Sequence, residues 1–256
     1  MEKEGNTNTR VNLGILEIGQ PYEIPYTEDI ENSPVVLIAG GTGVGKTYLA
    51  RGIAESLIKL NTPEGVHIHI LDSNDTRVWR NLAKEPHVKG HHKDLLTYND
   101  VLAEVKEECN KRQKELDEKG LATRKEYVDK YGEASMPLKV VIVDEIYGVM
   151  SKLGKYSEGE LNKFKEILVQ LSKEIQSTGI VLMALTYGAK EHAVPSEYVA
   201  NATLKVGMKM LDSSHEILFG KGLEEKGIEK PTNRGDFIVT TSEYPTPTFV
   251  KGKWRG

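Results

Sequence analysis

Residues 35–47 read Val-Val-Leu-Ile-Ala-Gly-Gly-Thr-Gly-Val-Gly-Lys-Thr, so a short apolar run leads directly into the pattern G-x-x-x-x-G-K-T. Glycines at these positions let backbone N–H groups close around phosphate oxygens, because no Cβ stands in the way. Lys46 supplies a compact charge for the β- and γ-phosphates, and the Thr47 hydroxyl is a ligand for Mg²⁺. The stretch therefore predicts a phosphate-binding P-loop.

The segment after the loop is predicted to be an amphipathic helix, because Leu49, Ile53, Leu57 and Leu60 recur near helical spacing. Its N-terminus adds a partial positive charge that favours a bound anion. We expect the residues from the end of the strand to the first helical turn to hold a nucleotide. They are Gly40, Gly41, Thr42, Gly43, Val44, Gly45, Lys46, Thr47 and Tyr48.

Short apolar runs alternate with helical patterns along the rest of the chain, which predicts an α/β fold with a mostly parallel sheet and helices on both faces. Residues 1–12 are predicted to be a flexible N-terminus and 13–256 a single domain. Further strands are expected within 11–34 and at 67–72, 139–143, 180–185 and 204–208, helices at 98–118, 121–131 and 158–177, and a C-terminal hairpin within 236–251.

Composition restricts the class of protein. The 256 residues are 38% apolar, enough for a core, and the net charge of −4 excludes a global basic field that would draw the chain onto nucleic acid. A single cysteine, Cys109, permits no internal disulfide. No apolar run reaches the ~20 residues of a membrane helix, and the N-terminus does not resemble a signal peptide. We expect a cytoplasmic protein whose nucleic-acid contacts, if it makes them, are local.

A second acidic motif follows the apolar run at 140–143, where Asp144 and Glu145 are adjacent. Carboxylates at the carboxyl end of a central strand lie beside the ligand in such sheets. Asp144 is expected to hold Mg²⁺ through water, and Glu145 to act as the catalytic base that polarises the attacking water, alongside Lys46. The simpler alternative is a strand that ends in a solvated acidic turn. The adjacent pair favours hydrolysis over nucleotide binding alone.

The motifs and their order resemble the FtsK/SpoIIIE family, within the FtsK–HerA superfamily of P-loop ATPases. Residues 37–47 are similar to the family's "LVAGxTGSGKS", 143–150 to "DEFADLM", and 178–186 to "AGIHLVLAT". Weaker likenesses are Ile70-Leu71-Asp72-Ser73-Asn74, Asn110-Lys111-Arg112 with the segment 120–127, and Gly235-Asp236-Phe237.

The resemblance implies a RecA-like motor core that uses ATP and Mg²⁺ to move double-stranded DNA, assembled as a homo-hexameric ring. From the sequence as given we expect a motor without a membrane anchor, without a domain before it and without a DNA-reading domain after it. That architecture favours a plasmid, phage or integrative element, acting in DNA transfer or segregation. A membrane or relaxase partner remains unidentified.

Two positions depart from the family pattern. The arginine that reaches the neighbouring subunit's nucleotide corresponds to Gln176, and the glutamine that senses the γ-phosphate corresponds to Tyr187. An arginine finger is worth orders of magnitude in rate. Another cation would have to serve in its place, with Lys173, Arg124 and Arg234 as candidates, or hydrolysis would be slow.

DNA contacts are expected from two loops after core strands, 151–159 with Lys152 and Lys155, and 188–196 with Lys190. The alternative is that these are plain surface loops. His87, His91 and His92 are predicted to lie in a solvated loop and not at a metal, because no matching cluster stands elsewhere in the sequence.

Three functions remain open at this point. The first is an ATP-driven DNA translocase. The second is an ATPase that hands DNA to a conjugation channel or a capsid. The third, from a different class, is a nucleotide-gated assembly or adaptor protein with little turnover, which the departures at Gln176 and Tyr187 keep under consideration.

Overall fold

The computed structural model describes residues 8–17, 23–189 and 193–252, and within them an eight-stranded sheet runs through the molecule in the order β10-β9-β8-β3-β7-β6-β4-β5. The strands from β8 to β5 are parallel, β9 is antiparallel to β8, and β10 to β9. Their bounds are β3 Val35–Ala39, β4 Val66–Leu71, β5 Val88–His92, β6 Leu138–Val143, β7 Ile180–Thr186, β8 Leu204–Met208, β9 Phe237–Thr241 and β10 Thr248–Val250. The predicted α/β class with a C-terminal hairpin is confirmed.

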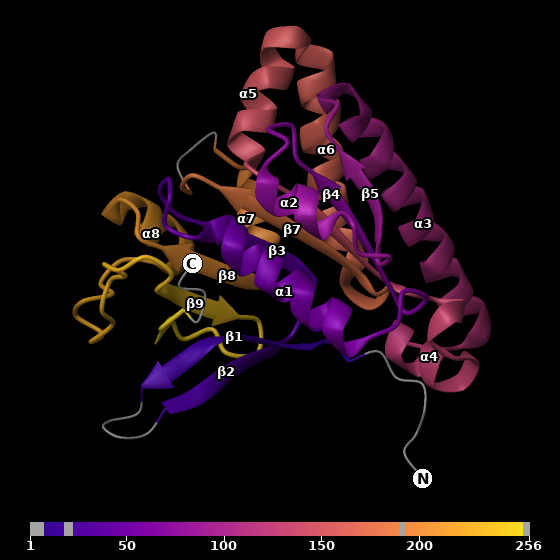
Figure 1. The fold of residues 1–256 in the computed structure, drawn as a ribbon, viewed down its shortest axis with the longest axis horizontal. Coiled ribbons are helices and arrows are strands. Elements are labelled where there is room, and N and C mark those ends of the chain that lie inside the picture. Colours follow the sequence, from indigo (N-terminus) through magenta and orange to yellow (C-terminus); the bar gives the residue numbers. More distant parts are fainter. Residues whose placement is uncertain (1–7, 18–22, 190–192, 253–256) are drawn as a thin grey trace.

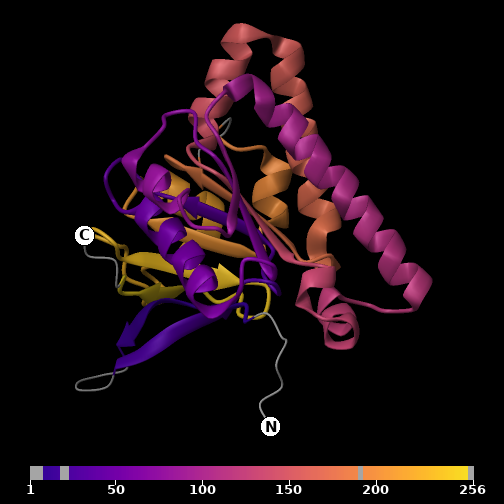
Figure 2. The same cartoon turned by 45° about the vertical axis from the view of Figure 1, so that its right-hand side comes forward.

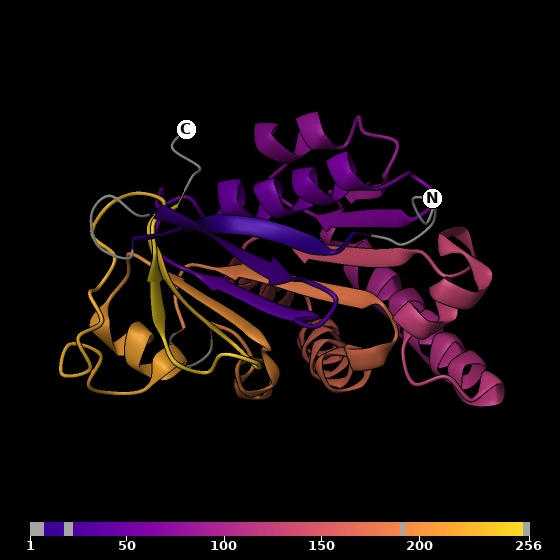
Figure 3. The same cartoon turned by 90° about the horizontal axis from the view of Figure 1, so that it is seen from below.

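Helices cover both faces of this sheet, which explains why β3 and β7 are buried along their whole lengths. One face packs on α1 and α2, the other on α3, α5, α6, α7 and α8 (Figures 1 and 3). The helices are α1 Lys46–Leu60, α2 Arg77–Leu82, α3 Tyr98–Lys119, α4 Arg124–Tyr131, α5 Ile146–Tyr156, α6 Glu158–Glu174, α7 Ser196–Asn201 and α8 Asp212–Phe219. None of the helices described has the length and apolar character to cross a membrane.

A separate antiparallel hairpin, β1 (Arg10–Glu17) and β2 (Glu23–Asp29), leads into β3. Val11 and Leu13 are buried in the same core as α1. Residues 10–12, expected in the flexible N-terminus, therefore lie in β1, where the apolar side chain of Val11 is part of that core. A bridge between Ile15 and Lys251 joins the hairpin to the C-terminal part of the sheet.

The loop expected at 151–159 is instead the end of α5 and the start of α6. An apolar stripe of Ile146, Val149, Met150 and Leu153 continues through the segment at helical spacing and is buried. Ser157 then separates the two helices and caps α6 by accepting a hydrogen bond from the Glu160 N–H. Both views show the α5–α6 hairpin extending past the sheet (Figures 1 and 2).

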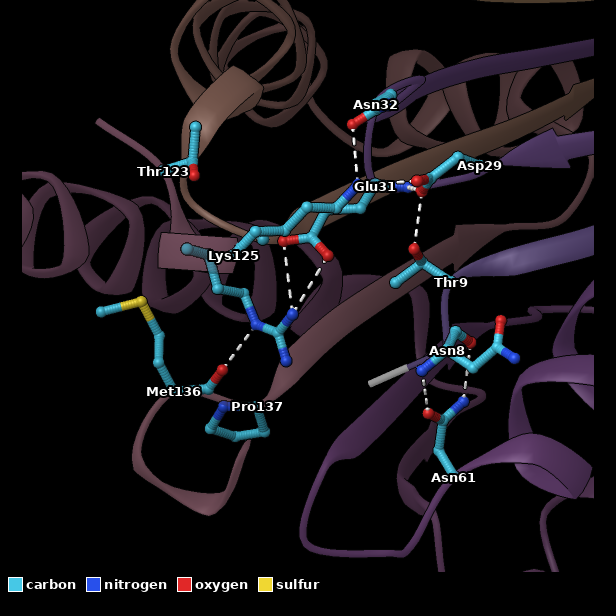
Figure 4. Close-up of polar contacts among 12 residues, drawn as sticks. Asn8, Thr9, Asp29, Glu31, Asn32, Asn61, Thr123, Lys125, Met136 and Pro137 are labelled. Atoms are coloured by element: carbon cyan, nitrogen blue, oxygen red, sulfur yellow. Dashed lines mark hydrogen bonds and ion pairs between the residues drawn. The ribbon is translucent and has the colours of Figure 1, made fainter. Parts of the chain in front are cut away.

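Arg124, the first residue of α4, is buried at the end of the sheet where β7 begins, away from the α5–α6 hairpin. Its Nη1 lies 3.1 Å from Glu31 Oε2, and its Nε donates to the Met136 carbonyl at 2.6 Å. A Cβ on Gly179 would come within 1.8 Å of Arg124 Cδ, so this position requires glycine, and its φ of +66° agrees. Figure 4 shows Glu31 in this cluster, close to Lys125, with the Thr9–Asp29 hydrogen bond nearby. The ion pair ties α4 to the connection between β2 and β3.

Glu31→Gln should lower the free energy of unfolding by about 3 kcal/mol, because it removes the carboxylate charge that pairs with the buried Arg124 guanidinium. Urea denaturation measures the change. The matched control is Glu55→Gln, which breaks the partly exposed Arg51–Glu55 pair in α1 and should cost less than about 0.5 kcal/mol. Equal changes in the free energy of unfolding would show that the buried Arg124–Glu31 pair stabilises the fold no more than the partly exposed pair does.

Candidate active site

The P-loop segment joins β3 to α1 through a tight turn at the carboxyl edge of the sheet. Gly43 and Gly45 have φ values of +74° and +116°, a region that favours glycine. At Gly40 a Cβ would lie 2.8 Å from both Met208 Cβ and Val44 Cγ2, so the chain needs glycine there to pass between β8 and its own loop. The glycines at these three positions are therefore required by the backbone.

Lys46 lies almost fully inside this loop, with 8% of its surface exposed. Its Nζ donates to the carbonyls of Gly40 at 2.8 Å and Gly41 at 3.0 Å. Burial lowers the pKa of Lys46, and the charges of Glu145 and Asp144 partly offset that effect. The ammonium is thus held at the loop within the field of both carboxylates.

Asp144 and Glu145 follow β6, two strands from β3 with β7 between them. Glu145 has φ +56° and ψ +59°, a left-handed conformation that is uncommon for a residue other than glycine. Its Oε1 accepts a hydrogen bond from the Tyr187 backbone N–H at 3.2 Å. Thr186, at the end of β7, accepts from the Gly40 N–H at 3.2 Å. The end of β7 and the residue that follows it therefore bond to both motifs.

The Asp144 carboxyl is only 6% exposed. Its pKa is raised to about 6, mainly by burial and further by Asp72 and Glu145, while a hydrogen bond from Trp79 Nε1 at 2.7 Å opposes the rise. The neighbouring Asp72 is completely buried and accepts from the Thr76 N–H at 2.6 Å. This concentration of negative charge suits a bound cation.

The few oxygen ligands that the chain offers here suit Mg²⁺ better than a metal held entirely by protein side chains. Mg²⁺ keeps several waters and takes only one or two protein oxygens beside phosphate. Thr47 in the first turn of α1 and Asp144 after β6 can supply them. Among residues 8–17, 23–189 and 193–252, no group of three or more His, Cys, Asp or Glu side chains is placed to hold a metal.

Tyr48 and Arg234 form an exposed surface beside the loop. The Arg234 guanidinium lies 5.7 Å from the centre of the Tyr48 ring, within cation–π range. The next residue, Gly235, donates its N–H to the Val44 carbonyl at 2.9 Å. The segment before β9 is thereby fixed against the P-loop of the same chain.

The cations considered as substitutes for an arginine finger occupy three different settings. Arg124 is buried in its ion pair with Glu31, so it is unsuited to reach another subunit. Arg234 faces Tyr48 of its own chain. Lys173 is exposed near the end of α6, and Gln176 is exposed in the short 3₁₀ turn that follows α6.

The expected DNA-contact lysines also differ in their surroundings. Lys152 and Lys155 are exposed on α5 and not in a loop. Lys152 Nζ already donates to Ser73 Oγ and Asn74 Oδ1, each at 3.0 Å. Lys190 lies outside the described residues. Lys155 makes no hydrogen bond or ion pair within the described part of the chain. It is therefore the candidate most available for a contact with DNA.

Sequence reasoning missed Trp79, which holds Asp144, and gave Asp72 no role in the site. The sequence Arg77-Val78-Trp79 carries no motif, and its short helix α2 was not predicted. Of the three histidines expected in a solvated loop, His87 does lie in a turn but is buried, and the prediction for the other two is wrong. His91 and His92 belong to β5, where His91 Nε2 lies 3.5 Å from Asp72 Oδ2.

Comparisons with known proteins agree with the fold and the motifs. The model of the FtsK/SpoIIIE family matches residues 3–218. DNA translocase FtsK of Staphylococcus aureus (strain Mu50) is 23% identical over 96% of this chain and 31% of its own length. The Treponema pallidum (strain Nichols) DNA translocase FtsK is 22% identical over 90% of this chain and 28% of its own length. The chain thus spans about a third of these relatives.

Solved structures share the fold at low sequence identity. The pCW3 conjugation coupling protein TcpA, in its monomer form with ATPγS, superposes with a TM-score of 0.80 at 20% identity, over 100% of this chain and 68% of its own. ATPases 2 and 3 of EssC from Geobacillus thermodenitrificans give 0.79 at 18% identity, over 97% and 45%. These likenesses establish a P-loop ATPase fold.

Asp144→Asn should flatten the dependence of stability on pH. Because the pKa of Asp144 is raised to about 6, the folded protein binds its proton more tightly than the unfolded chain does. This carboxyl therefore makes the free energy of unfolding fall as pH rises from about 4 to about 6, by about 3 kcal/mol in all. Urea unfolding across this range, in chelator and without nucleotide, measures the difference between wild type and variant.

The exposed Asp129→Asn serves as control and should leave the wild-type profile unchanged. Trp79→Phe removes the hydrogen bond that lowers the pKa of Asp144, so it should shift the fall in stability to higher pH. Parallel profiles for wild type and Asp144→Asn would contradict the raised pKa.

Proposed function

The chain belongs to the FtsK/SpoIIIE family, and from that premise we propose that it is an ATP-driven motor that moves double-stranded DNA. The observation that carries the proposal is the meeting of the P-loop with Asp144 and Glu145 at one edge of the sheet. Glu145 is held there by the Tyr187 N–H, in an uncommon backbone conformation. Strained backbone conformations of this kind cluster at catalytic sites.

Binding of ATP is assigned to residues 40–48. The amides of Gly40 and Gly41 are already bonded to the carbonyls of Thr186 and Lys209. The amides that face phosphate therefore begin at Thr42 and end in the first turn of α1, where the helix dipole favours the anion. Lys46 would exchange its two carbonyl partners for the β- and γ-phosphate oxygens.

Mg²⁺, when bound, neutralises charge that develops on the transferring phosphoryl group. Thr47 would ligate it directly and Asp144 through water, which would also lower the pKa of Asp144. Glu145 lies next to Asp144 with one carboxylate oxygen held by Tyr187, so the other oxygen can accept a hydrogen bond from the attacking water. This arrangement serves hydrolysis better than binding alone.

DNA movement and ring assembly extend the proposal beyond the site. The relatives that share the family are named DNA translocases, and the described chain corresponds to about a third of their length. We assign it the motor part, acting as a homo-hexamer in the cytoplasm. A role in handing DNA to a conjugation channel is the second candidate, favoured by the likeness to the coupling protein TcpA.

Lys46→Ala should abolish ATP hydrolysis by removing the charge on the phosphates. Glu145→Gln should leave ATP affinity unchanged and lower turnover by about 10²- to 10⁴-fold, because it removes only the base. Binding of a fluorescent ATP analogue and release of phosphate measure the two properties separately. Undiminished turnover by Glu145→Gln would exclude the base assignment.

The nucleotide-gated adaptor makes a different prediction for the wild-type protein. It requires ATP binding without stimulation of hydrolysis by duplex DNA. A steady-state assay with and without duplex DNA distinguishes the two functions, since a motor turns over faster when its track is present.

Lys155→Glu should weaken stimulation by DNA and leave basal hydrolysis intact, because Lys155 is exposed on α5 and lies outside the nucleotide site. For each DNA phosphate that the variant no longer neutralises, the slope of log affinity against log salt should become shallower by about 0.9. Titration of duplex DNA at several salt concentrations gives the slope. Lys114→Glu on the exposed face of α3 is the control; an equal weakening there would indicate general charge repulsion.

A further inference from the structure

A groove on the face opposite α1 belongs to no part of the nucleotide site. It has a volume of about 1210 Å³ and lies among α6, α7 and α8, on the side of the sheet that Figure 1 shows behind β3 and β8. This exceeds the ~300–1,000 Å³ of ordinary small-molecule sites. Its apolar walls are formed by Val169, Ala189, Val194, Pro195, Val199 and Ile217.

The groove contains an uncompensated charge, Lys205. This residue stands in β8, opposite Leu37 on one neighbouring strand and Thr240 on the other. Its flanking residues Leu204 and Val206 point into the core of the other face, so strand alternation directs Lys205 into the groove. Burial lowers the pKa of Lys205, and burial is the sole cause of that shift.

No ion pair or hydrogen bond of the Lys205 side chain exists within the part of the chain that the structure describes. A half-buried ammonium without a partner costs free energy that a carboxylate can recover. The nearby Glu197 is engaged by Ser196 Oγ at 3.0 Å, and Glu166 by Gln170 Nε2 at 3.2 Å. The charge of Lys205 is thus left for a group from outside.

We propose that this groove binds an extended peptide segment of a partner protein, with apolar side chains against its walls and a carboxylate on Lys205. The binding site goes beyond the motor function and does not depend on it. Among the described residues, three lysines and two glutamates line the groove, so an occupant with a single negative charge balances these charges.

Duplex DNA matches this surface poorly. It presents one negative charge per ~1.7 Å of helix axis and no apolar face. The carboxylates of Glu166 and Glu197 on the lining would repel it, and the apolar walls would contact water or phosphate. A small anion likewise leaves the walls uncovered. A short segment with apolar side chains around one acidic residue can contact the walls and pair with Lys205.

The test uses the whole chain and an array of short synthetic peptides, with varied apolar residues around one fixed central position. That position is glutamate, glutamine or lysine. The wild-type protein should prefer glutamate over glutamine by about tenfold in affinity, which corresponds to ~1.4 kcal/mol. Lys205→Met should abolish the preference, and Lys205→Glu should prefer the lysine peptides.

Lys114→Met on α3 is the matched control and should keep the wild-type preference. Lys205→Met should unfold at no lower temperature than wild type, because it breaks no ion pair. If Lys205→Glu does not fold, the comparison of wild type with Lys205→Met decides the question alone. ATP hydrolysis, measured in the same variants, reports on the motor function separately.

Three results would overturn the peptide site. The first is no binding of any peptide at up to about 1 mM, or equal binding of all three classes. The second is displacement of bound peptide by duplex DNA together with absence of DNA binding in Lys205→Met, which would make this a phosphate site. The third is self-association in sedimentation that Lys205→Met abolishes, which would assign the groove to a second copy of the chain.

Discussion

The parallel ladder of β3, β7 and β6 determines how far the P-loop lies from the two carboxylates. Val35 pairs with Leu182, and Val141 pairs with that same Leu182 from the other side, so the three strands reach the carboxyl edge together. All three are buried and apolar because helices cover both faces. Slippage of one strand against another would move Lys46 away from Asp144 and Glu145, and the core on both faces opposes such slippage.

The charges at that edge of the sheet are unequal, and the negative excess favours the binding of a cation. The charges of Asp72 and Glu145 raise the pKa of Asp144, while the nearby Lys46 ammonium lowers it. Trp79 and Thr76 donate hydrogen bonds that stabilise two of the carboxylates without supplying charge. The site therefore retains an excess of negative charge, which a divalent cation bound with a nucleotide would neutralise.

Sequence patterns predicted the elements that depend on local periodicity and on glycine. The strands at 35–39 and 204–208 have those bounds, and the helix expected at 98–118 is α3. Contacts between distant segments were beyond prediction: Trp79 with Asp144, and Arg124 with Glu31, are 65 and 93 residues apart. β5 was missed because His91 and His92 lack an apolar pattern, and edge strands need only one neighbour. The end of α5 was predicted to be a loop because lysines alternate with the apolar residues of its buried stripe.

The departure at Tyr187 has a smaller effect on the site than the family pattern suggests. The contact that holds Glu145 comes from the Tyr187 backbone N–H, and any residue except proline can donate it. Tyr187 in place of the family's glutamine therefore leaves Glu145, the base that we propose, in position, and changes only the side chain that the family pattern places at the γ-phosphate. The Tyr187 ring is half exposed beside Gly41, where it can cover the entrance to the loop. In the proposed mechanism the Tyr187 backbone would position Glu145 whichever side chain stands at 187, and sensing of the γ-phosphate would be a separate role.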